Sequence, residues 1–167
     1  MMILRHHKKP QAHISEIKLD NASFLPQVVK LLNEGHTVTI SLKGYSMRPF
    51  LEDGRDKALL TKPINPMVGD PVLAEIGPGH FVLHRIVKMD GGEVTLRGDG
   101  NIGVELCHKK DICGAVVGFY RKGRRKLDRT DGMKWHLYSY VWMRLMPVRG
   151  YLLAAYRRLW MPLFGPF

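Results

Sequence analysis

Residues 81–101 read FVLHRIVKMDGGEVTLRGDGN. Two apolar runs, 81–87 and 94–96, flank the turn residues Asp90-Gly91-Gly92, and the second run leads into another glycine-rich turn. Short apolar runs bounded by such turns are typical of β-strands joined as hairpins. The stretch therefore predicts antiparallel strands, and the same rhythm continues on both sides of it.

Further short apolar runs occur at 58–60, 72–76 and 112–119. Turn residues separate them at Asn65-Pro66, Gly69-Asp70 and Gly77-Pro78-Gly79. Before them, Val38, Ile40 and Leu42 alternate with polar residues, which is the period of a half-buried strand. We therefore expect a mainly β domain with a coiled, antiparallel sheet.

Helices are predicted at both ends of this domain. Ser23 opens a segment with helical apolar spacing that closes at Gly35, and Pro26 falls in its first turn. Two short helices are expected within 135–160, where Pro147 and Gly150 interrupt the chain. We expect the first to pack through Leu137, Tyr140, Val141, Arg144 and Leu145, and the second through Tyr151, Leu152, Ala155, Tyr156 and Leu159.

The positive charge is concentrated in the tail. Of a formal net charge of +11, residues 121–167 carry eleven basic and two acidic side chains, so the first 120 residues are close to neutral. The length suits one compact domain with an appendage. We expect a flexible N-terminal arm at 1–20, a domain at 21–120, and a basic, aromatic-rich helical tail at 121–167.

Several classes of protein are disfavoured. Residues 1–10 lack the apolar core of a secretory signal, and no uncharged apolar run approaches the roughly 20 residues of a spanning helix. Cys107 and Cys113 are too few for a secreted disulfide framework, and Cys107-His108 is a weak metal motif without a second ligand pair. We expect a cytoplasmic protein, or one held peripherally at the inner face of the membrane, with no metal or cofactor.

The segment Gly44-Tyr45-Ser46-Met47-Arg48-Pro49 follows the predicted strand at 38–42. A serine just past a strand, beside a glycine that lets the backbone bend, can expose its hydroxyl and direct backbone N–H groups to one point. A serine nucleophile requires that arrangement. The same residue types also form ordinary turns, so the segment alone leaves both interpretations open.

Two further motifs lie downstream. His84 shares a strand face with Val82 and Ile86, and an apolar setting keeps an imidazole neutral and able to act as a base, although many such histidines are only structural. Asp99 lies in the turn Gly98-Asp99-Gly100-Asn101, where an aspartate commonly caps its own backbone. Whether His84 and Asp99 are catalytic or structural depends on which side chains lie beside them in the folded chain.

Together and in this order, the motifs resemble the signal-peptidase superfamily, which includes bacterial signal peptidases and self-cleaving repressor peptidases. Its Gly-x-Ser-Met-x-Pro turn matches Gly44, Ser46, Met47 and Pro49, and Gly69-Asp70 resembles its recurring Gly-Asp. The endoplasmic-reticulum and archaeal branch has His-Arg-Val or His-Arg-Ile, followed by Lys-Gly-Asp-Asn-Asn. This chain resembles that branch in the segments 84–87 and 97–101, and the similarity spans residues 38–117.

The resemblance implies a catalytic site. Ser46 would be the nucleophile and His84 its general base. The carboxylate that orients the histidine would be either Asp99, which matches the Gly-Asp of the motif, or Glu105, which falls at the family's later aspartate position. Because Gly44 stands where some members have a serine, the oxyanion hole would use backbone N–H groups, including that of Ser46.

The bacterial branch uses a lysine base instead. The candidates for it are Lys43, Lys57, Lys62 and Lys88. None of them stands where His84 stands in the motif, so a serine–lysine pair is the less favoured arrangement. Arg85 is expected to lie on a strand face or to form a salt bridge rather than to act in catalysis.

The implied activity of the domain at 21–120 is that of a serine endopeptidase removing a leader, signal or propeptide from a protein or peptide. Membrane-bound members carry a spanning helix before the serine turn, whereas 23–35 is too short and polar here, which favours a cytosolic substrate.

The tail at 121–167 is expected to pack on the domain, dock a partner protein or bind an anionic membrane surface. Nucleic acid is a disfavoured partner, because no nucleic-acid module accompanies the charge. The competing interpretation of the whole chain is a catalytically silent domain that binds an extended peptide, or a membrane-surface adaptor.

Overall fold

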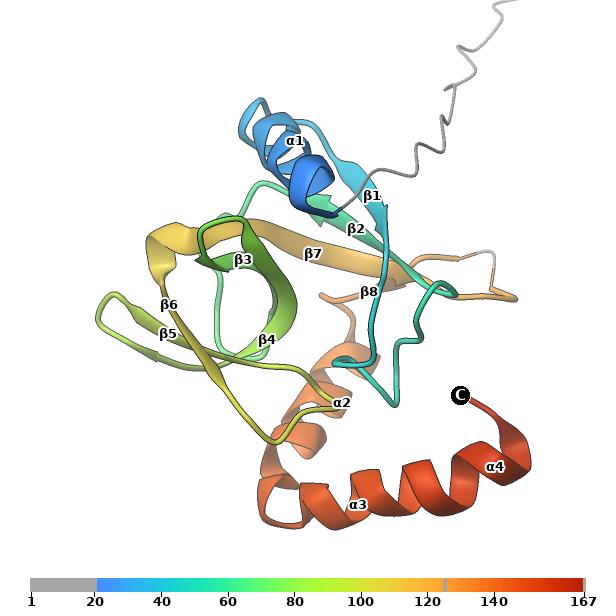
Figure 1. The fold of residues 1–167 in the computed structure, drawn as a ribbon. Helices are drawn as coiled ribbons and strands as arrows, with labels where there is room; N and C mark the ends of the chain where they lie inside the picture. Colours follow the sequence, from blue (N-terminus) through green and yellow to red (C-terminus); the bar gives the residue numbers. More distant parts are fainter. Residues whose placement is uncertain (1–20, 125, 167) are drawn as a thin grey trace, which may run out of the picture.

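The computed structural model describes residues 21–124 and 126–166, with side chains from residue 24 onward. The arm predicted at 1–20 lies outside these residues. Within them the chain forms mainly an antiparallel β-sheet, with a helix before it and a helical segment after it (Figure 1). The predicted fold class is therefore confirmed.

Eight strands form the sheet of the described residues. They are β1 (Val38–Ser41), β2 (Lys57–Thr61), β3 (Pro71–Gly77), β4 (His80–Asp90), β5 (Glu93–Arg97), β6 (Glu105–His108), β7 (Ile112–Tyr120) and β8 (Asp128–Arg129). Their order is β1-β2-β7-β3-β4-β5-β6, with β8 beside β7, and all pairs are antiparallel. Strands β6 and β8 were not predicted, because neither contains an apolar run of its own.

Helix α1 (Asn21–Asn33) packs on β7. Val28 and Leu32 are fully buried, and a Cβ atom added at Gly114 of β7 would lie 2.9 Å from Leu32 Cδ1. The close approach of helix and strand therefore depends on a residue without a side chain. The helix begins earlier than predicted, so Pro26 lies inside it, at a solvent-exposed position, rather than in its first turn.

Apolar side chains gather in two clusters. The first lies between α1, the β1–β2–β7 part of the sheet and the tail, and includes Leu32, Leu60, Phe119 and Trp135. The second lies among β3, β4, β5 and β6, and includes Val72, Ile86, Val94 and Leu96. Strand β4 contributes Leu83 to the first cluster and Ile86 to the second, so both of its faces are covered. His84 and Arg85 therefore project to opposite faces of a buried strand.

The tail is helical, as predicted. It comprises α2 (Met133–Arg144), a turn η2 (Met146–Val148), α3 (Arg149–Ala155), the π-helical segment η3 (Tyr156–Trp160) and α4 (Met161–Phe164). A short turn, η1 (Lys109–Asp111), precedes β7. The last three elements continue one another in Figure 1, and we call residues 149–164 the C-terminal helix. No helix of the described residues has the length and apolar character needed to cross a bilayer.

The packed face predicted for α2 is wrong. Leu137, Tyr140 and Val141 are exposed, and α2 instead packs on the sheet through Trp135, Tyr138, Ser139 and Trp142. Both sets have helical spacing, so the periodicity could not choose between them. The polar tips of the second set find buried partners on the domain, as described below, and that decides the orientation of α2.

In the C-terminal helix, Leu152, Ala155, Tyr156 and Leu159 line one hollow, whereas Tyr151, which was predicted on the same face, is largely exposed.

Candidate active site

The segment around Ser46 leaves the sheet at the end of β1. Gly44 has φ +86°, a conformation that favours glycine, and its N–H donates to Asp53 Oδ1 at 2.8 Å. Met47 and Leu51 are buried in the first apolar cluster. We call residues 44–49 the serine turn. Its two ends are fixed and Ser46 itself stays partly exposed.

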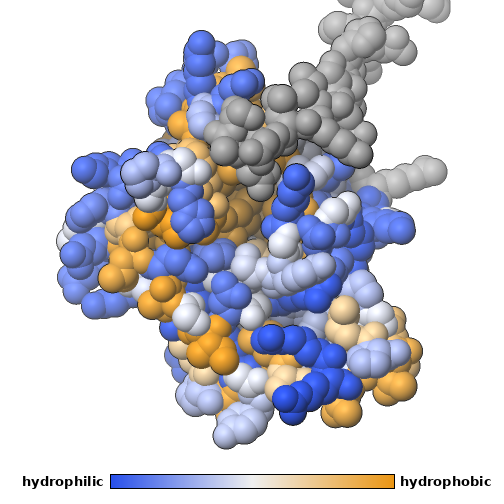
Figure 2. Space-filling model, in the orientation of Figure 1, coloured by the Kyte–Doolittle hydropathy of each residue, from blue (hydrophilic) through white to orange (hydrophobic). Residues whose placement is uncertain are grey.

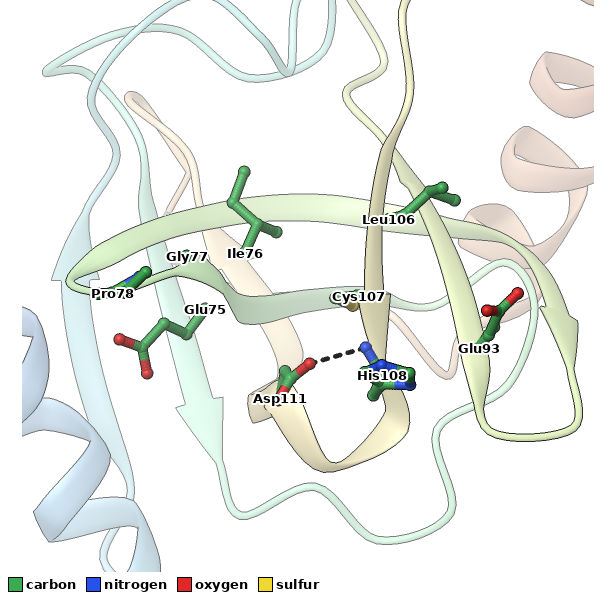
Figure 3. Close-up of a pocket in the computed structure, with 9 residues that line it drawn as sticks. All are labelled: Glu75, Ile76, Gly77, Pro78, Glu93, Leu106, Cys107, His108 and Asp111. Carbon is green, nitrogen blue, oxygen red and sulfur yellow. Dashed lines mark hydrogen bonds between the residues drawn. The ribbon is translucent and has the colours of Figure 1, made fainter.

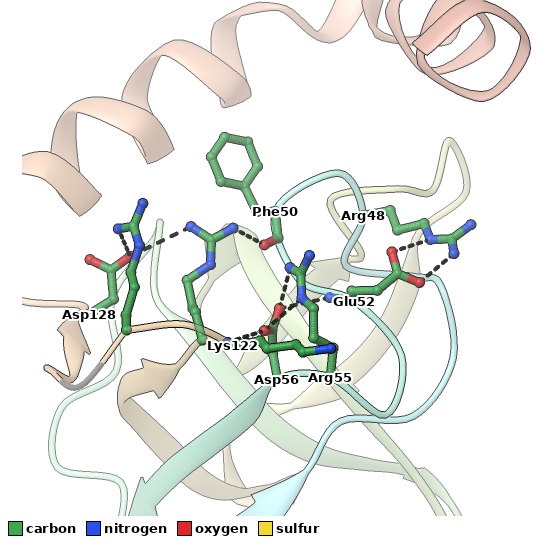
Figure 4. Close-up of polar contacts among 9 residues, drawn as sticks. Arg48, Phe50, Glu52, Arg55, Asp56, Lys122 and Asp128 are labelled. Carbon is green, nitrogen blue, oxygen red and sulfur yellow. Dashed lines mark hydrogen bonds and ion pairs between the residues drawn. The ribbon is translucent and has the colours of Figure 1, made fainter. Parts of the chain in front are cut away.

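A polar network closes the loop that carries this turn (Figure 4). The buried Asp56 carboxylate accepts from Arg55 Nε at 2.9 Å and from the Glu52 N–H at 3.0 Å, while Glu52 is bound by Arg48 of the serine turn. Burial alone would raise the pKa of Asp56, but the hydrogen bonds from Arg55, Glu52 and Lys122 outweigh burial and lower it below its usual range. The charged form of Asp56 therefore organises the loop.

His84 lies in the middle of β4, opposite Val72 of β3, and is only 4% exposed. Its Nδ1 lies 2.9 Å from Glu105 Oε2, and the Glu105 side chain, at the start of β6, is 26% exposed. The imidazole therefore has a carboxylate beside one ring nitrogen, Nδ1, and its other ring nitrogen, Nε2, faces a different part of the chain.

Gly98 brings His84 and Ser46 together. A Cβ atom added at Gly98 would lie 3.0 Å from His84 Nε2 and 2.3 Å from the Ser46 carbonyl oxygen, so both approach the same point. The Gly100 N–H donates to that carbonyl oxygen at 2.7 Å. A Cβ atom at Gly100 would in turn lie 2.7 Å from the Tyr45 carbonyl oxygen. The Gly98-Asp99-Gly100 turn is thus wedged against the serine turn, beside the Nε2 side of His84.

The hydroxyl of Ser46 makes no direct hydrogen bond to His84 among the residues that the structure describes. Hydrogen bonds between catalytic groups are often long in the absence of substrate and tighten when it binds. A direct proton transfer from Ser46 to His84 would require the hydroxyl to come within hydrogen-bond distance of the imidazole.

Asp99 does not contact His84. It is 1% exposed and binds the buried Arg85 guanidinium, with Oδ1 2.9 Å from Nε and Oδ2 2.7 Å from Nη2. Arg85 projects from the opposite face of β4, so this ion pair is on the far side of the strand from His84. Burial would lower the pKa of Arg85, but the Asp99 charge outweighs it and raises the pKa. The salt bridge expected for Arg85 is therefore present, and Asp99 is its partner rather than a cap of its own turn.

The same ion pair fixes the tail to the sheet. Tyr138 of α2 donates its hydroxyl to Asp99 Oδ2 at 2.8 Å, Trp142 Nε1 donates to the Asp99 carbonyl oxygen at 3.2 Å, and Arg85 donates to Ser139 Oγ. Burial, together with the Asp99 charge, raises the pKa of Tyr138 well above its ordinary value, so the hydroxyl stays protonated and can donate. Sequence reasoning missed these partners, although polar tips within an aromatic stripe were the available signal.

The four candidate lysines lie on the surface. Lys43, Lys57, Lys62 and Lys88 are all exposed, and Lys88 pairs with Asp90 at 3.1 Å. His84, in contrast, is buried and lies close to the serine turn. Gly44, where some members of the resembled family have a hydroxyl, has no atom within 4 Å of an added Cβ.

A separate hollow of the described surface lies away from these residues (Figure 3). It has a volume of about 600 Å³ and is lined by the β3–β4 turn, Glu93 and β6, without Ser46, His84 or Glu105. Cys107 and His108 lie there, but the described residues hold no cluster of three metal-ligating side chains. Asp111 accepts the His108 N–H at 2.7 Å, and burial raises the pKa of the Cys107 thiol.

The structure therefore groups Ser46, His84 and Glu105, whereas the Asp99 side chain binds Arg85 and Tyr138 instead of His84. Models of known protein families do not match this sequence, and neither do the curated proteins with which it was compared.

Proposed function

We propose that this protein is a serine endopeptidase with Ser46 as nucleophile, His84 as general base and Glu105 as the carboxylate that orients the histidine. The observation that carries the proposal is the buried His84 imidazole, with Glu105 2.9 Å from Nδ1 and the serine turn packed, through Gly98, against the Nε2 side. The resemblance of the serine and histidine motifs to the signal-peptidase superfamily supports the same assignment.

Each residue then has a chemical task. Glu105 accepts a hydrogen bond from Nδ1–H, which fixes the tautomer with a free lone pair on Nε2. The Ser46 oxygen attacks the carbonyl carbon of the scissile bond while its proton passes to Nε2, and His84 then gives that proton to the leaving amine. Water, activated by the same imidazole, releases the acyl group from Ser46.

The oxyanion that forms during attack needs hydrogen-bond donors. The backbone N–H of Ser46 is the first of these, and the turn geometry at Gly44 and the anchored Met47 hold it in place. Removal of one such donor in a related chemistry costs about 10²–10³ in turnover. The network around Asp56 is therefore a support for catalysis as well as for folding.

The proposed reaction removes a leader, signal or propeptide from a protein or peptide substrate. It is tested by incubating the full chain with a mixture of synthetic peptides of diverse sequence and identifying products by mass spectrometry. We expect cleavage by the wild type and by Ser41→Ala, which changes an exposed serine of β1, and none by Ser46→Ala. Cleavage that persists in Ser46→Ala would overturn the proposal.

The competing function is a catalytically silent domain that binds an extended peptide. Two observations favour it: the missing hydrogen bond between Ser46 and His84 in the described residues, and the edge positions of β1 and β6, which can pair with an added strand. If the folded wild type bound a peptide tightly and left it intact, the peptide-binding function would be favoured over the peptidase.

A further inference from the structure

The C-terminal helix is packed on the domain at its beginning and exposed at its end. Arg149, Leu153 and Tyr156 are buried, whereas Leu159 is 65% and Leu163 73% exposed. Soluble monomeric proteins rarely expose large contiguous apolar patches without a function. Figure 2 shows hydrophobic side chains gathered around the end of this helix, beside hydrophilic ones.

The exposed apolar side chains border an open hollow. It has a volume of about 410 Å³, and its walls are Trp142 of α2, Pro49 of the serine turn and the apolar face of the C-terminal helix. From that helix come Leu152, Leu159, Leu163 and Phe164, among others. The hollow therefore joins the apolar surface of the helix to the serine turn.

The charge of this part of the chain has one sign. Residues 133–166 include Lys134, Arg144, Arg149, Arg157 and Arg158 and no aspartate or glutamate. Arg157 and Arg158 are exposed on the helix that carries the apolar patch. An apolar face beside arginines matches the interface of an anionic bilayer, where apolar groups enter the acyl boundary and arginines meet lipid phosphates.

We propose that the C-terminal helix is a docking element for an anionic lipid membrane. It lies in the plane of the interface, since at about 24 Å it is too short to cross the hydrocarbon core. A second copy of the chain fits less well, because it would bring the same positive charge to the same surface. Docking would also turn Pro49, and with it the serine turn, toward the lipid.

The test uses the full chain, sedimented with vesicles of phosphatidylcholine alone or with 30% phosphatidylglycerol. We expect binding to the anionic vesicles at least tenfold tighter than to the neutral ones at 0.1 M salt, and weaker at 0.5 M. Arg157→Gln/Arg158→Gln should weaken it about 30-fold. Leu159→Ser/Leu163→Ser, at exposed positions that leave folding intact, should weaken it at least tenfold.

Matched controls are Lys109→Gln/Lys110→Gln and Leu106→Ser, which change exposed residues on or next to β6. These variants should bind like the wild type. Equal binding to neutral and anionic vesicles, or wild-type binding by either tail variant, would overturn the proposal. If the wild type formed a dimer without lipid and the Leu159→Ser/Leu163→Ser variant were a monomer, the surface would be assigned to a second copy instead. The outcome is independent of whether Ser46 cleaves peptides.

Discussion

The serine turn and the C-terminal helix both border Pro49, yet they are held in different ways. The turn is anchored by buried Met47, by the neighbouring buried Leu51, and by hydrogen bonds from Gly44 to Asp53 and from Arg48 to Glu52. The C-terminal helix is anchored only near its start and presents Leu159 and Leu163 to solvent. Rigid support suits chemistry, and an exposed amphipathic face suits docking.

Asp99 and Glu105, the two alternatives for the carboxylate that orients His84, also differ in their surroundings. Glu105 contacts His84 and is partly exposed, whereas Asp99 is buried with Arg85 and binds α2. One carboxylate belongs to the candidate site and the other to the joint between the sheet and the tail. Separate substitutions should therefore affect activity and stability separately.

The largest effect is expected for Glu105→Gln. Loss of the orienting carboxylate allows the wrong histidine tautomer and should lower the rate of peptide cleavage about 10⁴-fold, with little change in the free energy of unfolding. Cleavage rate and urea denaturation are measured on the same samples. The control is Glu93→Gln, which changes an exposed residue of β5 and should alter neither the cleavage rate nor the free energy of unfolding. A Glu105→Gln enzyme with wild-type turnover would remove Glu105 from the site.

The next effect is on stability. Asp99→Asn leaves the buried Arg85 charge without its ion-pair partner and should lower the free energy of unfolding by about 3–5 kcal/mol. It should also loosen α2, which near-ultraviolet circular dichroism of Trp135 and Trp142 would report. Asp90→Asn, which removes an exposed pair with Lys88, should cost less than about 1 kcal/mol. Similar losses of stability from both changes would contradict the role of Asp99 in attaching α2 to the sheet.

A smaller effect on activity is expected for Gly98→Ala. The added Cβ would lie 2.3 Å from the Ser46 carbonyl oxygen, so the serine turn must move relative to His84. A shift of about 1 Å can cost about 10² in rate. Gly103→Ala is the matched control, because a Cβ there meets nothing within 4 Å. Equal cleavage rates for both variants would show that the contact at Gly98 does not set the geometry.

The smallest effect is the response to acid of the hydrogen bonds around Asp56, which close the loop that carries the serine turn. Because the folded-state pKa of Asp56 lies below its unfolded value, its contribution to stability is complete above the unfolded pKa and is lost as pH falls through the folded one. Urea denaturation between pH 7 and pH 3 should show this loss. Asp56→Asn should be less stable at pH 7 by about 1–3 kcal/mol and should respond less to acid. An unchanged slope with pH would contradict the role of the charged form.

Local patterns predicted most of the sheet, and the order of the motifs drew attention to Ser46 and His84, with Asp99 and Glu105 as alternatives for the carboxylate. Ser46 follows an alternating strand and His84 lies within an apolar one, so their settings can be inferred from neighbours in sequence. Strand β6 contains too few apolar residues to be recognised, and Glu105 begins it. The choice between Asp99 and Glu105 depends on strand register, which local sequence does not encode.

The tail shows a second limit of prediction from sequence, which concerns the buried face of a helix. Helix α2 has two stripes with helical spacing, and the stripe that packs is selected by the Asp99 carboxylate, which accepts from Tyr138, and by Arg85, which donates to Ser139. Those partners lie more than thirty residues away in the chain. Apolar periodicity therefore predicted the helix but not the face that it buries.

The most direct measurement of the central claim is mass spectrometry of the full chain after reaction with a fluorophosphonate probe, which acylation-competent serines attack. We predict a single adduct on Ser46, none on Ser41, and a reaction at least 10²-fold slower in His84→Ala than in His80→Ala, which changes an exposed histidine of β4. A folded wild-type protein without an adduct on Ser46, or one labelled equally fast in His84→Ala, would contradict the account.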